Sequence, residues 1–110
     1  MELSHGCQPI HAQCWIDWDQ QGIWRDQEFV SLPWRTFQLL ACLVQHANQV
    51  VPHTMLFMVG WEEPRTRWDL QAHIHRIRLA IELDPHHPQW LVTRREGGYL
   101  LHLESWSQHA

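Results

Sequence analysis

The sequence contains no lysine: all eight basic residues are arginine, in a chain of 110 residues with a formal net charge of -4. Its three cysteines, Cys7, Cys14 and Cys42, are odd in number and lack metal-ligand spacing, which argues against a disulfide framework. No apolar run approaches the roughly 18 residues that a membrane-spanning helix needs, and the first residues do not resemble a secretion signal. These absences predict a single cytoplasmic domain with no membrane partner.

The sequence also lacks the short motifs that catalytic sites use. It has no glycine-rich loop that could hold phosphates, and no serine or cysteine lies in a recognisable nucleophile motif. His73 and His75 are two residues apart, so on a helix they point in different directions and cannot share a metal ion. We therefore expect no enzyme activity, no cofactor and no metal site.

The arginines are concentrated in the second part of the chain. Residues 1–63 hold two arginines against seven acidic residues, whereas residues 64–110 hold six arginines against five. A local cationic face on an acidic body can still bind phosphate, although the acidic body weakens non-specific affinity. Arginine offers planar paired donors that suit phosphate and guanine edges. Residues 64–110 are therefore where we expect a nucleic-acid contact.

Apolar periodicity predicts a small sheet followed by helices. Residues 1–12 show no periodicity and are expected to form a loose arm. Residues 14–32 alternate around two polar turns, which is typical of an antiparallel meander. Helical spacing follows from Phe37 to Val44 and again over about 52–59. The expected divisions are an arm over residues 1–12, a folded domain over 13–104 and a tail over 105–110.

A third helix, expected over about 67–83, is the clearest element. Its apolar residues recur at offsets of four, three and four and form one narrow seam: Leu70, Ile74, Ile77 and Ile81. With this seam buried, His75 and Arg76 point outward. His73 and Arg78 lie on the two flanks of the same helix. One side of the helix is thus core, and the other is available for binding.

The ends of this helix are marked by polar and proline residues. Thr66 and Asp69 are both candidates for its N-terminal cap. Two prolines after Asp84 cannot continue the helix, so the chain must turn there. Alternation then resumes over about 90–103 around a Gly-Gly bend, which predicts a closing β-hairpin.

Tryptophan is abundant, and most of the eight lie in patterns that predict packing. Trp68 and Trp106 are the two that we expect to be exposed. Those expected to pack are Trp15, Trp18, Trp24, Trp34, Trp61 and Trp90. A stacking surface for single-stranded nucleic acid is therefore not expected.

Residues in all three helices and in the hairpin match a known family in order and spacing: Phe37, Leu39, Leu40, Val50, Val51, Leu56, Trp61, His73, Ile74, Arg76, Ile77, Arg78, Thr93, Gly98 and Tyr99. Through them, the segment from Leu32 to Leu101 resembles the winged-helix DNA-binding domain of OmpR/PhoB-type bacterial regulators. The resemblance implies an α+β fold. This fold is a winged helix-turn-helix with a small N-terminal antiparallel sheet, three helices and a C-terminal β-hairpin wing.

The resemblance implies that the third helix lies in the major groove of double-stranded DNA and the wing touches backbone or minor groove. The residues then expected to contact DNA are Arg67, His73, His75, Arg76, Arg78, Thr93, Arg94 and Arg95. The implied function is sequence-specific DNA binding as part of a bacterial transcriptional regulator. A homodimer on repeated half-sites and RNA polymerase are the further partners implied. His75 and Glu96 depart from the family's usual arginine and glycine, which reduces the expected phosphate affinity.

The alternative interpretation is a winged helix that docks onto a protein and does not bind DNA. It is motivated by the acidic net charge, by Glu96 in the wing, and by Leu79 and Leu83, which the helical spacing turns outward. A continuous positive stripe over the helix and wing favours DNA, whereas a neutral face lined by leucine favours a protein partner.

Overall fold

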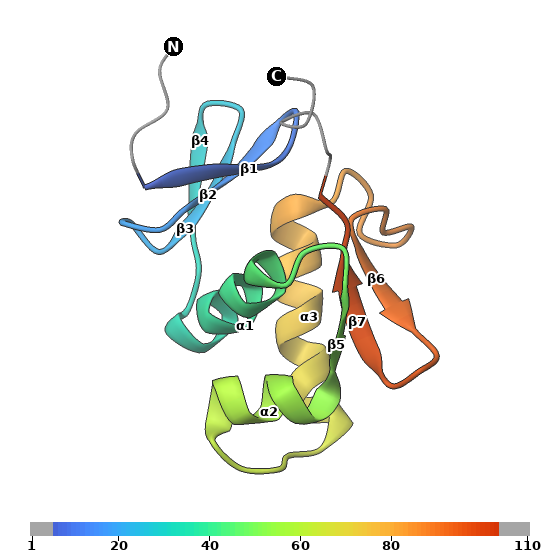
Figure 1. The fold of residues 1–110 in the computed structure, drawn as a ribbon. Helices are drawn as coiled ribbons and strands as arrows, with labels where there is room; N and C mark the ends of the chain where they lie inside the picture. The colour runs from blue at the N-terminus through green and yellow to red at the C-terminus, as the bar shows by residue number, and fades with distance from the viewer. Residues whose placement is uncertain (1–5, 104–110) are drawn as a thin grey trace.

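A computed structural model describes residues 6–103 as a four-stranded sheet, three helices and a second, three-stranded sheet (Figure 1). The elements in chain order are β1 Cys7–His11, β2 Cys14–Asp17, β3 Gly22–Arg25, β4 Glu28–Ser31, α1 Trp34–Gln45, β5 Val50–Pro52, α2 His53–Trp61, α3 Arg67–Ile81, β6 Leu91–Arg94 and β7 Gly98–Leu101. The predicted order of sheet, three helices and hairpin is confirmed, as is the α+β winged helix-turn-helix architecture.

The first four strands pair with their sequence neighbours as an antiparallel meander. The predicted strands within residues 14–32 are confirmed, but the loose arm expected over residues 1–12 is wrong for β1. The register of β1 shifts between Pro9 and His11, so the adjacent Ile10 and His11 are both buried. A bulge of this kind removes the period-two alternation by which a strand is recognised. Residues 1–5 and the expected tail over 105–110 lie outside the described residues.

Each helix turns its apolar side toward the core, and α2 and α3 both pack against α1. All four seam residues of α3 are at most 1% exposed, as their spacing predicts: Leu70, Ile74, Ile77 and Ile81. Thr66 caps α3, since its hydroxyl accepts from the Asp69 N–H at 3.3 Å while the Asp69 carboxylate accepts from the Thr66 N–H at 3.2 Å. This reciprocal capping box fixes where α3 begins. Both candidate capping residues therefore take part in it.

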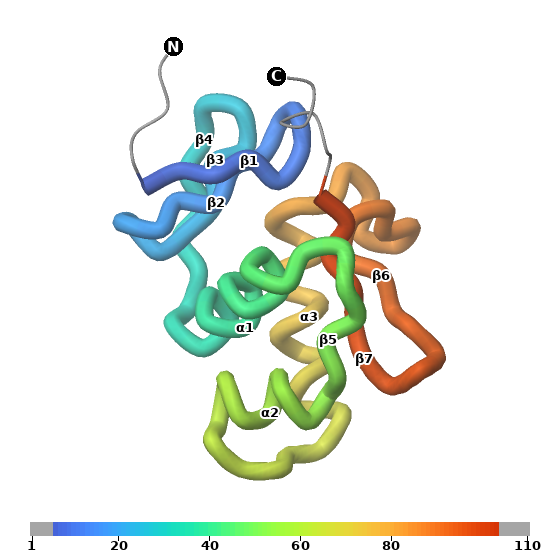
Figure 2. The backbone as a smooth tube through the Cα atoms, in the orientation of Figure 1, coloured from blue at the N-terminus to red at the C-terminus, as the bar shows by residue number. Residues whose placement is uncertain are grey.

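The hairpin that follows α3 is completed by β5, in the strand order β5-β7-β6. Gly97 turns the chain at a φ of 96°, a conformation that favours glycine. At Gly98 a side chain would collide with the carbonyl oxygen of Val51, so glycine lets β5 and β7 approach closely. The expected hairpin is confirmed, and its loop projects from the body of the molecule in Figure 2.

A buried glutamate links the end of α3 to the start of the hairpin. Glu82 is 1% exposed, and its carboxylate accepts backbone N–H bonds from Gln89, Trp90 and Leu91 at 2.7–3.3 Å. The helix ends at Ile81, two residues before the expected boundary, because Glu82 is already extended. This carboxylate sets how β6 leaves the end of α3.

Candidate nucleic-acid interface

The two elements predicted to contact DNA lie side by side and are joined by Arg78. Its Nε donates to the Leu91 carbonyl oxygen at 3.0 Å, and its Nη2 donates to the Thr93 hydroxyl at 3.1 Å. Its guanidinium also lies 5.9 Å from the centre of the Tyr99 ring. Figure 1 shows α3 beside β6 and β7, with the hairpin loop toward the α2 end of the molecule and away from the β1–β4 sheet. Arg78 therefore holds the helix and the hairpin as one surface.

The eight arginines divide into two sets of four by their internal contacts. The engaged set donates to carbonyl oxygens, a hydroxyl or carboxylates within the protein and comprises Arg25, Arg35, Arg65 and Arg78. The side chains of the other four are exposed and make no hydrogen bond or ion pair with residues 6–103; we call them the free quartet: Arg67, Arg76, Arg94 and Arg95. All four members of the free quartet belong to α3 or to the hairpin.

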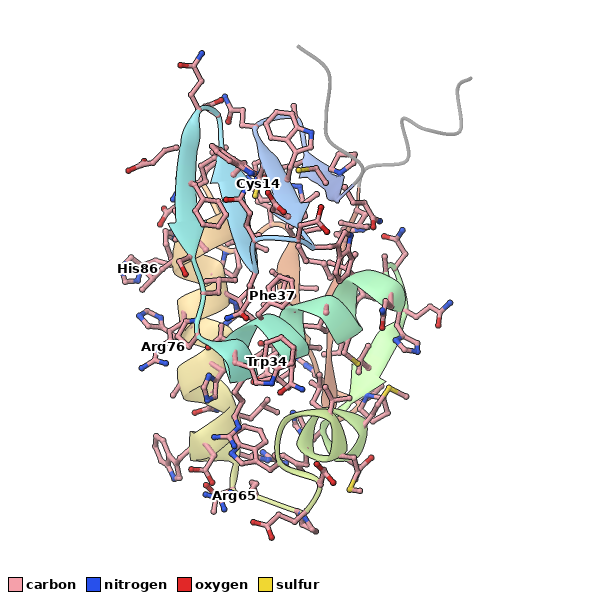
Figure 3. The ribbon with its side chains drawn as sticks, turned by 90° about the vertical axis from the view of Figure 1, so that its left-hand side faces the viewer. Cys14, Trp34, Phe37, Arg65, Arg76 and His86 are labelled. Atoms are coloured by element: carbon pink, nitrogen blue, oxygen red, sulfur yellow. The ribbon has the colours of Figure 1, made fainter. Side chains whose placement is uncertain are left out.

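The free quartet spans both elements. Arg67 opens α3 close to α2 and the hairpin: burial lowers the pKa of His53, and the Arg67 charge lowers it further. Arg76 points outward from α3 in Figure 3. Arg94 ends β6, and Arg95 follows it in the loop, next to the exposed Glu96. Uncompensated arginines therefore lie both on α3 and at the tip of the hairpin, with the acidic residues Asp69 in the first turn of α3 and Glu96 at the tip beside them.

His73 is turned toward the core instead of toward solvent. Its Nδ1 lies 2.8 Å from the hydroxyl of the buried Thr36, and its ring meets Trp61 edge-on at 5.5 Å. Burial lowers the pKa of His73, and the charges of Arg76 and Arg35 lower it further. A neutral His73 thus ties α3 to α1.

The residues predicted to contact DNA are therefore of two kinds. The side chains of His73, Arg78 and Thr93 make hydrogen bonds within the protein. The side chains of the others are exposed and make no such contact with residues 6–103: Arg67, His75, Arg76, Arg94 and Arg95. The helical spacing alone placed His73 and Arg78 on the flanks of α3, but their partners lie on α1 and the hairpin.

Lowering the pH below 6.5 is expected to destabilise the fold through His53 and His73. Both have a pKa below the ordinary 6.5, so protons bind more readily to the unfolded chain. Their stabilising contribution is complete above pH 6.5 and is lost as the pH falls through the folded-state pKa values. Urea unfolding of the wild type and a His53→Gln/His73→Asn variant, from about pH 8 to pH 5, measures this. As the pH falls, the free energy of unfolding should decrease less in the variant than in the wild type. If the two proteins lose stability in parallel, His53 and His73 do not cause the loss.

Two tryptophans are strongly exposed among the described residues. Trp68, expected to be exposed, is 80% exposed on the first turn of α3. Trp34 was expected to pack but is 60% exposed; it begins α1 and lines an open groove between α1 and α2. Its i, i+3 neighbour Phe37 fills the core beneath it, which leaves the indole outside. Trp106 lies outside the described residues. Trp68 was not among the residues predicted to contact DNA, although the helical spacing turns it to the same side as Arg76.

Other site types find no support in the described part of the chain. No helix within residues 6–103 is long and apolar enough to cross a bilayer. Across the same residues, no three histidine, cysteine or acidic side chains are placed to hold a metal ion. Burial raises the pKa of the Cys14 thiol to about 12, so this cysteine is a poor nucleophile. The surface formed by α3 and the hairpin remains the candidate site.

Solved structures of regulators share this fold. The Thermotoga maritima response regulator DrrB, an OmpR/PhoB homolog, aligns at 29% identity and a TM-score of 0.78 over 88% of this chain. That alignment covers 44% of DrrB, so the chain spans less than half of that regulator. The Klebsiella pneumoniae RstA DNA-binding domain, solved with the RstA box, aligns at 22% identity and a TM-score of 0.72, covering 89% of this chain and 98% of that one.

A third structure and a family model agree with these two. The DNA-binding domain of CpxR from E. coli aligns at 24% identity and a TM-score of 0.72, covering 88% of this chain and 96% of that one. At identities below 25%, RstA and CpxR show the fold alone. Residues 26–101, well over half of the chain, match the family model described as the C-terminal part of transcriptional regulatory proteins. The resemblance read from the sequence is confirmed, and the chain belongs to the OmpR/PhoB-type family of transcriptional regulatory C-terminal domains.

Proposed function

We propose that the chain binds double-stranded DNA sequence-specifically, with α3 in the major groove and the β6–β7 hairpin on the backbone or minor groove. The observation that carries this proposal is the division of the arginines. In a protein with a net charge of -4, carboxylates are available to neutralise them, and Arg65 contacts two. The free quartet contacts none within residues 6–103, and all four of its members belong to α3 or to the adjacent hairpin. Uncompensated guanidinium groups on a helix and an adjacent hairpin suit a polyanion with two grooves.

The proposed roles follow from where each side chain lies. Arg76 and His75 face outward on α3 and reach base edges, where a guanidinium pairs with the O6 and N7 of guanine. The remaining members of the free quartet contact phosphates: Arg67, Arg94 and Arg95. These contacts fix the position of the protein along the duplex. Arg78 and Thr93 position the wing without touching DNA, and His73 positions α3. The Klebsiella RstA DNA-binding domain, which shares this fold, was solved in complex with the RstA box, and this supports DNA binding by this chain.

We further infer that two copies occupy neighbouring half-sites. A single module of this size buries about 600–1,000 Å² on DNA, so useful affinity calls for a homodimer on repeated sequences. RNA polymerase is the partner through which such a bound regulator would act on transcription. Both inferences depend on DNA binding and are secondary to it.

The salt dependence of binding tests the proposal. A duplex selected from a random pool, labelled with a fluorophore, is titrated with protein at several salt concentrations. Each phosphate engaged contributes a slope of about -0.9 to log K against log salt, so the three phosphate contacts proposed for Arg67, Arg94 and Arg95 predict a slope of about -2.7 for each bound copy. The slope comes from counterions released when guanidinium groups replace them at phosphates.

Failure of this titration would favour the docking alternative. Leu79 and Leu83 are 50% and 60% exposed near the end of α3, as their spacing predicted, and they would then form the contact surface. If the random pool yields no enriched sequence, or if binding has a flat salt response, the chain does not bind DNA in the way proposed. A sequence-enriched, salt-sensitive complex supports DNA over a protein partner.

A further inference from the structure

The side of α3 that faces away from the core, which we call the outward ridge, begins with two apolar side chains, Trp68 and Ala72. Trp68 is the second residue of the helix and is 80% exposed, and Ala72, one turn later, is also exposed. The Trp68 indole makes no hydrogen bond or ring contact with other residues in the described range 6–103. The fold therefore does not need this ring for packing, and its large apolar area is available to a partner.

Charge on both sides of the ridge restricts what that partner can be. Arg67 precedes Trp68 directly, and Arg76 lies two turns further along the helix; both belong to the free quartet. A partner that covers the indole must therefore also accept two unneutralised guanidinium groups. Duplex DNA meets both requirements, because its major groove has phosphate walls and carries one apolar group at its floor, the 5-methyl group of thymine.

The position of Trp68 in the helix agrees with such a contact. In helix-turn-helix proteins the N-terminal residues of the recognition helix are the ones that reach base edges. Trp68 and Ala72 are four residues apart, about 6 Å along the helix, and base pairs are stacked about 3.4 Å apart. Two side chains this far apart can therefore reach neighbouring base pairs.

We propose that Trp68, assisted by Ala72, determines specificity by packing against thymine 5-methyl groups, so that the preferred site carries thymine opposite the first two turns of α3. The proposal rests on the DNA binding proposed above and adds the chemical group that is read. Methyl groups distinguish thymine from cytosine at a position where no hydrogen bond is made. The arginines then supply affinity and guanine contacts, while the indole supplies discrimination for thymine.

Removing single methyl groups from the DNA tests this inference. In the selected duplex, each thymine is replaced in turn by deoxyuridine, which keeps base pairing and the O4 acceptor but removes the 5-methyl group. Transfer of one such group from water corresponds to about a three- to five-fold change in Kd, so wild-type protein should lose about this factor at one or two thymines. The readout is fluorescence anisotropy at one fixed salt concentration.

Protein variants assign the effect to the indole. Trp68→Ala should bind the thymine duplex more weakly and should show no further loss on the sensitive deoxyuridine duplex. Trp34→Ala is the matched control, since Trp34 is also exposed but lies on α1, and it should keep the full wild-type penalty. Because the substituted DNA is first read by wild-type protein, that measurement does not depend on the folding of any variant.

The outcomes separate this inference from the proposed function. If thymine and deoxyuridine duplexes bind equally to wild type, or if Trp68→Ala keeps the full penalty, the indole does not read methyl groups. Salt-sensitive, sequence-selective binding would then still stand. If no duplex is bound at all, the proposed function fails, and this inference fails with it.

Discussion

Replacing Glu82 with alanine is expected to lower the free energy of unfolding by about 3–5 kcal/mol. The carboxylate is buried and accepts backbone N–H bonds from Gln89, Trp90 and Leu91. Its removal leaves three donors without this acceptor, of which the Leu91 N–H is buried and the other two are partly buried. Each buried donor left without an acceptor costs about 1–3 kcal/mol. Chemical denaturation followed by circular dichroism measures the loss, and an unchanged dependence on denaturant would show that the same transition is compared.

Glu28→Ala is the matched control for this variant. Glu28 is an exposed glutamate on β4, so its replacement removes the same charge without stranding a buried donor. Surface changes of this kind stay within about 0.5 kcal/mol of the wild type. A loss below about 1 kcal/mol in Glu82→Ala would mean that water replaces the carboxylate and that the link between α3 and β6 does not depend on it.

The Glu82 carboxylate also bears on the proposed binding, because it acts at the junction between the two elements that we propose to contact DNA. It holds the backbone at the start of β6, while Arg78 ties Leu91 and Thr93 of the same strand to α3. Both contacts connect the helix to the hairpin, one at each side of the strand's first residue. The spacing between the cations of α3 and those of the wing is therefore set by the polar contacts of Glu82 and Arg78 and not by the free quartet itself.

The sequence predicts a helix or strand well when the residues that identify it all lie within that helix or strand. The seam of α3 is read from four apolar residues, and the capping box from Thr66 and Asp69, which are three residues apart. The hairpin follows from alternation on both sides of two glycines. β1 was missed because its bulge puts Ile10 and His11 on the same buried side, which no local alternation rule anticipates.

The roles of the candidate site residues could be predicted only in part, because their partners are distant in the sequence. Nothing near His73 indicates that Thr36, 37 residues earlier, will meet its ring. Nothing near Arg78 indicates that Thr93 will accept its donor. The exposure of Arg76 is easier to predict, since its side chain needs no partner within the fold and its direction follows from the helical spacing alone.

Replacing Arg76 and Arg94 together with alanine is expected to weaken binding to the selected duplex about a hundredfold or more, which is about 3 kcal/mol. The reason is that we propose a base contact for Arg76 and a phosphate contact for Arg94, and the two residues lie on separate elements. Their effects should add, because they share no contact within residues 6–103. Anisotropy titrations give the affinity, and repeating them over a range of salt concentrations gives the number of phosphates engaged.

The double variant Arg25→Ala/Arg35→Ala is the control, because it removes the same number of positive charges from the engaged set. Both arginines donate to backbone carbonyl oxygens, Arg25 to Leu79 and Arg35 to Gly60. If this control weakens binding as much, net charge governs affinity and the division of the arginines has no functional meaning. The single variants then separate the roles: Arg94→Ala should weaken all sequences alike and reduce the salt slope by about 1, whereas Arg76→Ala should relax the preference at one base pair. A loss of specificity in Arg94→Ala instead would place base reading in the wing.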